Sequence, residues 1–340
     1  MTGKSILVAS STRVPWYENQ SCQEHYDRQP YSLGAIMFNL EKLGWRVEWS
    51  GWQTTKSPQR LAARIDKFKP DIIYTYGSTV ALTPILCRRY ICAWKNFKVV
   101  HGWDDAYGDI WGDLAGWPGR ILMNAMEKRI VTRSDAVVTL SYFLRERGRK
   151  WGIESTYIPN GADPVDRAAV SGDIRLDGKL KLVYTGDQAR WKRTADICEA
   201  MRHVPKDIKL YLTGQHYKYL DKYASNNCVF LGYLSKAEQF NVMNQADVFV
   251  CTADQDCNAK IQEYLRWECP YLGYDGRANL FFKNGENAIL CKSADYPAAI
   301  IRLADNPSLR AEIAANAKRG IPIHSWAEIA RQFDAYFTNV

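Results

Sequence analysis

The sequence lacks the long hydrophobic run that would cross a membrane. None of its apolar stretches approaches the ~18 residues that a transmembrane helix requires. The first residues, MTGKSILVASSTR, are typical of a buried strand and contain no apolar segment of signal-peptide length. We therefore expect a cytoplasmic protein, whose contact with a membrane would be peripheral and on the inner face.

Paired cysteines and complete glycine-rich loops are also missing. The nine cysteines form no Cys-x-x-Cys motif, so a zinc knuckle is not expected. Their odd number and their places inside apolar runs are typical of buried, reduced thiols. Asp254 and Asp256 spell Asp-x-Asp, but not at a convincing metal position, and no metal is predicted. Neither a full P-loop nor a Gly-x-Gly-x-x-Gly motif occurs.

Acidic residues are scarce in the front half of the chain. The 340 residues include 45 Lys+Arg and 37 Asp+Glu, a formal net charge of +8. Residues 1–160 hold 22 Lys+Arg and 15 Asp+Glu, giving +7, so this half carries nearly all the excess. It could face an anionic partner such as phospholipid, lipid phosphate or nucleic acid; a solvated basic surface is the alternative.

Strand and helix signals alternate along the chain, which indicates βαβ units and parallel sheets covered on both faces. The alternation breaks at Pro159-Asn-Gly-Ala-Asp-Pro164 and restarts at Leu180. We therefore predict an α/β protein with two Rossmann-like, doubly wound domains facing a cleft. The predicted segments are a domain at 1–160, a linker at 161–179, a domain at 180–325 and a C-terminal helix at 326–340, near or across the interdomain junction.

The first candidate binding segment is a strand that runs into a glycine and a basic stretch. Residues 180–185 predict a buried strand, Gly186 permits close backbone approach, and a helix starts near Thr194. Arg190 and Lys192 add cations between them. This combination is typical of a diphosphate cradle, and a basic surface loop is the alternative.

The second candidate segment follows the strand predicted for residues 248–251. Asp256 or Asn258 would cap the next helix, and Lys260 would lie in its first turn. A cation there opposes the helix dipole, which makes sense if it meets an anionic ligand. Glu263 lies on the same face and could accept two hydrogen bonds from a ribose diol; a surface Lys–Glu pair is the alternative.

Five segments in order resemble the nucleotide-sugar domain of GT-B glycosyltransferases, most closely glycosyltransferase family 4. They are YIPNGAD, LVYTGDQARWK, VFLGYLSKAEQFNVMNQADVFVCT, NAKIQEYLRWECP followed by NGENAIL, and HSWAEIARQFDAYF. The resemblance covers about residues 157–340. It implies the GT-B fold, with 1–160 as the acceptor domain and 180–325 as the nucleotide-sugar domain.

The resemblance implies roles for the matching positions. Lys192 would pair with the donor diphosphate, and Glu263 would hold the nucleotide ribose. Lys260 would reach phosphate or sugar, and the backbone of residues 256–258 would lie against the transferred sugar. In the front half, His101 would bond a sugar hydroxyl or the developing acceptor charge; a structural histidine at a strand end is the alternative.

The implied reaction moves a sugar from a UDP- or GDP-linked donor to the hydroxyl of a glycan, a lipid-linked acceptor or a nucleic acid. It is hexosyltransferase-like, retains the anomeric configuration, and uses no metal or cofactor besides the donor substrate. Catalysis would rest on His101, Arg190 and Lys192, the two cations neutralising the leaving diphosphate.

Departures from the family pattern leave other functions open. Asp187 stands where the family usually places Arg, and Gln255 where it often has a second glutamate. A degenerate, non-catalytic GT-B binding protein is therefore one alternative. A DNA-modifying glycosyltransferase would suit the basic front half, and a nucleotide-sugar epimerase is disfavoured by the order of the motifs. The long loop 10–30, which includes His25 and Tyr26, is expected to bind the acceptor.

Overall fold

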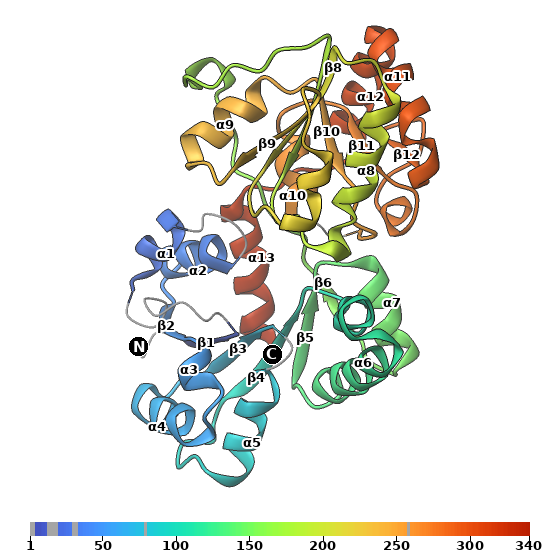
Figure 1. Ribbon diagram of the computed structural model, residues 1–340. Helices are drawn as coiled ribbons and strands as arrows, with labels where there is room; N and C mark the ends of the chain where they lie inside the picture. Colours follow the sequence, from blue (N-terminus) through green and yellow to red (C-terminus); the bar gives the residue numbers. More distant parts are fainter. Residues whose placement is uncertain (1–3, 12–19, 29–32, 78–79, 257–258) are drawn as a thin grey trace. The chain divides into compact units, whose positions relative to one another are not determined.

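The computed structural model describes residues 4–11, 20–28, 33–77, 80–256 and 259–340 (Figure 1). The chain divides into two compact units, one formed by Met1–Gly161 with His324–Val340 and the other by Ala162–Ile323. Each unit contains a six-stranded, all-parallel sheet with flanking helices. This confirms the predicted α/β class with two Rossmann-like sheets.

The sheet of the first unit has the strand order β2-β1-β3-β4-β5-β6. Every residue of β1 is buried, as expected for a parallel strand that is covered on both faces. The strands are β1 (Ser5–Ser10), β2 (Arg46–Ser50), β3 (Ile72–Tyr76), β4 (Lys98–Trp103), β5 (Ala136–Thr139) and β6 (Thr156–Tyr157). The helices are α1 (Cys22–Arg28), α2 (Leu33–Lys42), α3 (Trp52–Thr55), α4 (Pro58–Phe68), α5 (Leu82–Tyr90), α6 (Tyr107–Val131), α7 (Tyr142–Lys150) and α13 (Trp326–Asn339).

The sheet of the second unit has the strand order β12-β11-β10-β7-β8-β9. Its strands are β7 (Leu180–Thr185), β8 (Ile208–Thr213), β9 (Cys228–Gly232), β10 (Val248–Cys251), β11 (Tyr271–Tyr274) and β12 (Ile289–Cys291). Its helices are α8 (Thr194–Ala200), α9 (Lys236–Asn244), α10 (Ala259–Leu265), α11 (Tyr296–Asp305) and α12 (Pro307–Gly320). The strand order reverses between β7 and β10, and ligands of such sheets bind beyond the carboxyl ends of the strands at that switch point.

Most of the predicted linker is part of the second unit, because residues 162–179 pack against its core. The Arg167 guanidinium donates hydrogen bonds to the Trp267 carbonyl at 2.9 Å and to Asn244 Oδ1 at 3.0 Å. The apolar side chains that pack there are Val165, Val170, Ile174 and Leu176. The linker prediction is corrected accordingly: the polar composition of this segment concealed the apolar residues that anchor it.

The C-terminal helix α13 belongs to the first unit, where it lies beside α2 (Figure 1). Ser325 and Glu328 form a capping box that starts the helix, satisfying two backbone N–H groups. The Trp45 indole donates a hydrogen bond to Asp334 Oδ1 at 2.8 Å. The helix buries Trp326, Ile329, Ala330, Phe333 and Phe337 in the core of that unit.

Part of the loop expected at 10–30 is helix α1, and its aromatic residues pack inward. The His25 ring is 2% exposed and stacks on Trp49 with centroids 3.8 Å apart, and Tyr26 stacks on Phe38 at 4.7 Å. The structure therefore assigns these two side chains a role in packing rather than in binding an acceptor. Residues 12–19 and 29–32 of the expected loop lie outside the described residues.

Two further findings concern membranes and thiols. No helix within the described ranges is both long and apolar enough to cross a membrane. The eight described cysteines are all free thiols, and seven of them are buried. Cys257 lies outside the described residues.

Candidate functional site

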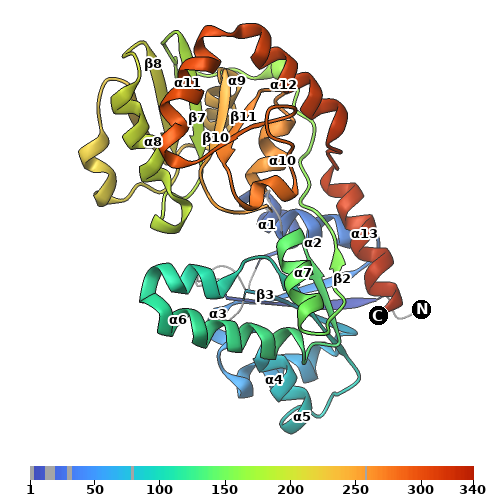
Figure 2. The same cartoon turned by 90° about the vertical axis from the view of Figure 1, so that its right-hand side faces the viewer.

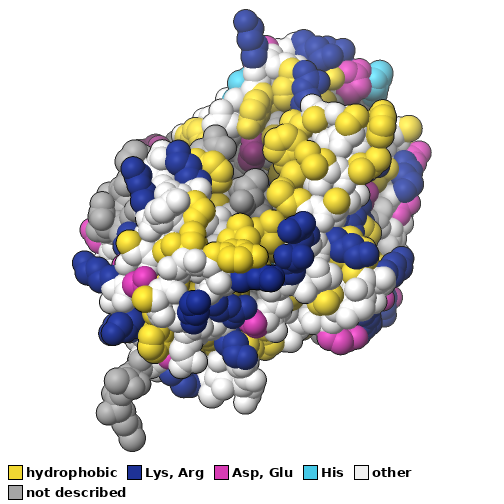
Figure 3. Space-filling view, turned by 90° about the horizontal axis from the view of Figure 1, so that it is seen from below, with side chains coloured by type: hydrophobic (Ala, Val, Ile, Leu, Met, Phe, Trp, Pro, Cys, Tyr) yellow, Lys and Arg dark blue, Asp and Glu magenta, His cyan; other side chains and the backbone are white. Residues whose placement is uncertain are grey.

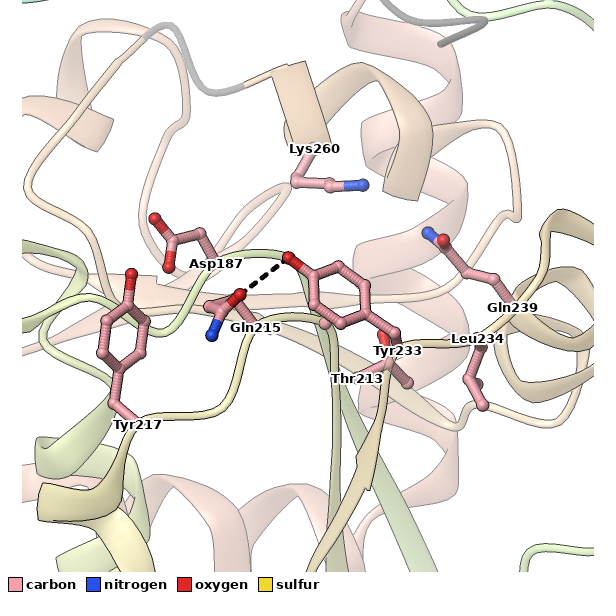
Figure 4. Close-up of a pocket in the computed structure, with 10 residues that line it drawn as sticks. Asp187, Thr213, Gln215, Tyr217, Tyr233, Leu234, Gln239 and Lys260 are labelled. Atoms are coloured by element: carbon pink, nitrogen blue, oxygen red, sulfur yellow. Dashed lines mark hydrogen bonds between the residues drawn. The ribbon is translucent and has the colours of Figure 1, made fainter. Parts of the chain in front are cut away.

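A pocket of about 350 Å³ opens at the carboxyl ends of β7 and β8 in the second unit (Figure 4). It is lined by Gly186, Asp187, Thr213, Gly214, Gln215, Tyr217, Tyr233, Leu234, Gln239 and Lys260. The strand that precedes Gly186 is next to the switch point of the sheet, where the topology favours ligand binding. The predicted residues Gly186 and Lys260 thus meet in one pocket.

Two glycines form the floor of this pocket. Gly186 and Gly214 end their strands with φ values of +122° and +102°, in the region that favours glycine. A Cβ on Gly214 would overlap the Gly186 carbonyl oxygen, so no other residue fits there. A Cβ on Gly186 would lie 3.5 Å from Lys260 Cε, so the lysine side chain lies next to this backbone. The floor therefore exposes backbone beside a cation, which suits a phosphate group.

Lys260 and Glu263 form an ion pair on α10. Lys260 Nζ donates to Glu263 Oε2 at 2.6 Å, and the Glu263 side chain is 4% exposed. Arg266 Nη2 lies 3.6 Å from Glu263 Oε1, but no hydrogen bond from the described residues reaches that oxygen. Buried carboxylate oxygens are normally hydrogen-bonded, and Oε1 is an exception. Glu263 does not line the pocket described above, and the cation next to its Oε1 is Arg266.

Lys192 forms hydrogen bonds with the segment that follows β10 and does not line the pocket. Its ammonium donates to Gln255 Oε1 at 3.2 Å, and its carbonyl accepts from Thr252 Oγ1 at 2.7 Å. The Arg190 guanidinium lies 4.6 Å from the centre of the Tyr219 ring. Neither cation lines the pocket described above, so only Lys260 of the predicted cations reaches it in this structure.

The segment predicted to face the sugar is partly described. Asp256 is buried at 3% exposure, and Asn258 lies outside the described residues. Asp254 Oδ1 accepts a hydrogen bond from the Arg277 backbone N–H at 2.7 Å, so this carboxylate holds the loop in place. Within the described residues, no group of three or more His, Cys, Asp or Glu side chains is placed to hold a metal ion.

His101 is a buried side chain of the first unit. It lies in β4 of the first unit, is 1% exposed, and its Nδ1 is 2.9 Å from Thr75 Oγ1. Burial lowers the pKa of His101 to about 3, so the imidazole is neutral at physiological pH. The structure therefore favours the structural interpretation of His101 over the catalytic one.

Sequence reasoning missed the second wall of the pocket. Tyr233 is 77% exposed, and its hydroxyl donates to Gln215 Oε1 at 2.8 Å (Figure 4). An exposed ring held at one end offers a flat apolar face for a planar ligand. The repeated strand–Thr–Gly pattern, Thr185-Gly186 and Thr213-Gly214, was the available signal, because it places two glycine turns on neighbouring strands.

Comparison of the sequence with protein-family models gives two matches, one in each half of the chain. Residues 18–166 match the family model described as Glycosyltransferase Family 4, and residues 192–335 match the model described as Glycosyl transferase-like. No curated protein matches the chain significantly in sequence.

Several solved structures share the whole fold. Sucrose-phosphate synthase from Thermosynechococcus elongatus has a TM-score of 0.78 at 16% identity, covering 99% of this chain and 98% of its own. Anabaena HepE in complex with UDP and glucose has a TM-score of 0.69 at 15% identity, covering 99% and 100%. A glycosyltransferase from Rickettsia africae has a TM-score of 0.67 at 12% identity, covering 100% and 99%.

The two parallel sheets, the glycine-floored pocket next to the switch point and the two family matches indicate a glycosyltransferase of the GT-B type, the class that transfers a sugar from a nucleotide sugar. Within this class, residues 18–166 match the family-4 model, and the solved structures named above share the fold of the whole chain.

Proposed function

We propose that the protein is a retaining, metal-independent glycosyltransferase that takes a nucleotide-diphosphate sugar, UDP-linked in the first instance, and glycosylates an acceptor hydroxyl. The observation that carries this proposal is the Lys260–Glu263 pair beside Gly186, because it puts a cation in the pocket next to the switch point and pairs it with a carboxylate whose Oε1 accepts no hydrogen bond from the described residues. The UDP and glucose named for the HepE complex support the choice of a uridine donor.

The donor would occupy the pocket in a defined orientation. Its diphosphate lies over Gly186 against Lys260, its ribose hydroxyls donate to Glu263, and its base packs on the exposed ring of Tyr233. Lys192 reaches the sugar end, since its ammonium is held by Gln255, next to the buried Asp256. The Arg190 guanidinium lies over the Tyr219 ring and would have to turn away from it to bind the diphosphate.

The chemical step needs electrostatic assistance rather than a nucleophilic side chain. The bond between the anomeric carbon and the phosphate oxygen breaks, and a bond from the same carbon to the acceptor oxygen forms on the same face. The acceptor proton moves to the leaving phosphate oxygen, so the protein supplies no base. Lys260 and Lys192 neutralise the charge that develops on the diphosphate.

Titration with UDP tests the site directly. We expect Lys260→Ala and Glu263→Ala to weaken UDP binding by about 10–100-fold, since each removes one or two charge-assisted hydrogen bonds. Lys192→Ala should lose most transfer activity. The matched control is Lys283→Ala, which removes the lysine of another Lys–Glu pair at the same spacing, Lys283–Glu286, exposed in the same unit. Wild-type UDP affinity in both site variants would contradict the proposal.

Two measurements test the finer statements. Transfer should persist in EDTA, and complete loss of activity there would contradict metal independence. NMR of the product should show the anomeric configuration of the donor, and inversion would contradict the retaining mechanism.

One observation favours a second function, a non-catalytic nucleotide-binding protein. The exposed Asp187 carboxylate lines the pocket in which the diphosphate would lie and repels it. UDP binding without hydrolysis or transfer of any nucleotide sugar would support this function over the enzymatic one.

A further inference from the structure

Helix α6 of the first unit is a helical hairpin. At Gly116 the backbone leaves the helical region, with φ 68° and ψ −165°. The two halves then run side by side, as Figure 2 shows. Glycines allow the close approach: a Cβ on Gly119 would lie 2.9 Å from the Trp111 carbonyl oxygen, and one on Gly112 would lie 2.5 Å from Arg120 Nε. The hairpin is therefore a preformed element rather than a loop.

The tip of this hairpin is apolar and open to solvent. Of the 11 large hydrophobic side chains that are exposed among the described residues, five lie within 12 residues of the chain on both sides of Gly116. They are Trp111 at 41%, Leu114 at 62%, Trp117 at 74%, Ile121 at 59% and Leu122 at 68% exposure. An apolar cluster of this size on a soluble unit marks an interaction surface.

The exposed charges of α6 are mostly positive, and those nearest to the tip are Asp113 and Arg120. Arg147 pairs with Asp109 at 3.3 Å and with Glu127 at 3.2 Å, so it offsets one of the two negative charges that these residues carry. The exposed charged residues that remain on α6 are Asp113, Arg120, Lys128 and Arg129. The whole first unit holds 23 Lys+Arg and 17 Asp+Glu, a net charge of +6.

We propose that the α6 hairpin docks the protein on an anionic lipid surface. Tryptophan favours the boundary between headgroups and acyl chains, and leucine favours the chains below it. Cations beside an apolar face are attracted by anionic headgroups. The hairpin projects from the first unit (Figure 2), and the view from below shows hydrophobic side chains bordered by Lys and Arg (Figure 3). A projecting tip enters a bilayer, whereas a protein partner would have to offer a matching groove.

Flotation of the full chain with vesicles tests this inference. We expect binding to phosphatidylcholine vesicles that contain phosphatidylglycerol, and much weaker binding to phosphatidylcholine alone. The triple variant Leu114→Ser, Trp117→Ser and Leu122→Ser should bind about 100-fold more weakly, because it removes apolar area at the tip. All three side chains are exposed, so the variant should keep the wild-type circular dichroism spectrum and thermal midpoint.

The matched control removes three other exposed apolar side chains of the same unit. They are Leu86, Tyr90 and Ile91 at the end of α5. Changing these residues to Ser should leave vesicle binding within about twofold, whereas Arg120→Glu with Lys128→Glu should weaken it about tenfold or more at low salt. Vesicle binding should blue-shift the tryptophan fluorescence, and Trp117→Phe should remove most of that shift while binding persists.

Three outcomes would overturn the inference: a wild-type protein that does not float with the anionic vesicles, a tip variant that floats as well as the wild type, and no difference between the two vesicle types. A dimer in light scattering that the tip variant abolishes, without any flotation, would assign the tip to a second copy of this chain instead. Since no nucleotide sugar is present, these results are independent of the proposed enzymatic function.

Discussion

Each unit contains a buried carboxylate that is paired with a cation, but the two carboxylates are satisfied differently. Glu127 of the first unit accepts from the Trp103 indole at 2.7 Å, from Arg147 at 3.2 and 3.3 Å, and from the Gly108 backbone at 3.4 Å. Glu263 of the second unit accepts from Lys260 at 2.6 Å, while its Oε1 has no hydrogen bond from the described residues. Glu127 is therefore saturated by the protein, whereas Glu263 Oε1 has the Arg266 guanidinium at 3.6 Å but no hydrogen bond from the described residues.

The carboxyl ends of the two sheets differ in the same way. In the second unit they carry glycine turns and a lysine beside a pocket. In the first unit they carry groups held in their neutral or poorly ionised forms. Burial, and then repulsion by Asp105, raises the pKa of Asp104 to about 7, and burial lowers the pKa of His101 to about 3. The carboxyl edge of the second unit's sheet therefore suits an anionic ligand. The carboxyl edge of the first unit's sheet carries little charge of its own.

The largest effect is expected where a saturated carboxylate loses its cation. Arg147→Met leaves Glu127 buried without its charge partner, which should lower the free energy of unfolding by about 3–5 kcal/mol. Urea denaturation of the full chain measures it. Arg149→Met, which breaks exposed pairs with Glu146 and Glu154, is the control and should cost about 0.2–1 kcal/mol. Equal losses in the two variants would remove the distinction between the sites.

The next effect concerns the pH dependence of the first unit. The pKa of His101 is lower in the folded state, about 3, than the ordinary value of 6.5, so the unfolded chain binds the proton more readily between these values. Stability is therefore lost as the pH falls, by about 2–3 kcal/mol between neutral pH and pH 4.5 from this group. Denaturation of the wild type and His101→Asn over this range should show a shallower slope in the variant. Parallel slopes would mean that His101 titrates normally.

Isosteric neutralisation compares the two carboxylates directly. Glu127→Gln loses charge-assisted hydrogen bonds and should cost about 2–3 kcal/mol of unfolding free energy, whereas Glu263→Gln should cost about 1 kcal/mol or less. Only Glu263→Gln should weaken UDP binding, by about tenfold. Denaturation and calorimetric titration of both variants give the four numbers. A larger stability loss at Glu263 than at Glu127 would assign Glu263 a structural role.

The smallest effect is expected at Asp187, the carboxylate that lines the anion pocket. Asp187→Asn should tighten UDP binding about three- to fivefold at low salt, because a negative charge near the diphosphate is removed. The gain should fade at high ionic strength, since exposed charges are screened. Titrations at two salt concentrations check both statements. Weaker UDP binding in the variant would mean that Asp187 contacts the ligand as an acceptor.

Most strands and helices could be predicted from the sequence, because an apolar run flanked by turn residues forms the same secondary structure in almost any tertiary context. Such local patterns predict the β7 strand, the Gly186 turn and the start of α8 at Thr194, and the structure contains all three. The front half of α6 was not, because Gly112, Gly116 and Pro118 are ordinary turn signals. The two halves pack closely there, a contact that such local signals do not contain.

Of the residues predicted for the site, the structure brings Gly186 and Lys260 together in one pocket. Lys260 and Glu263 are three residues apart on one helix, and this spacing alone places their side chains close enough to pair. The positions of Lys192, Arg190 and His101 depend on long-range partners, namely Gln255, Tyr219 and Thr75. No local rule contains such partners, and a mobile cation near a pocket can turn toward any of several neighbours.

The sequence by itself determined the alternation of strands and helices, the glycine turn after β7 and the Lys–Glu spacing, because each depends on residues close together in the chain. Only the tertiary structure decided which carboxylate keeps an unused oxygen, that His101 is sealed inside its sheet, and that the α6 tip stays uncovered. Burial and hydrogen-bond saturation depend on distant residues, and these two properties separate a binding group from a structural one.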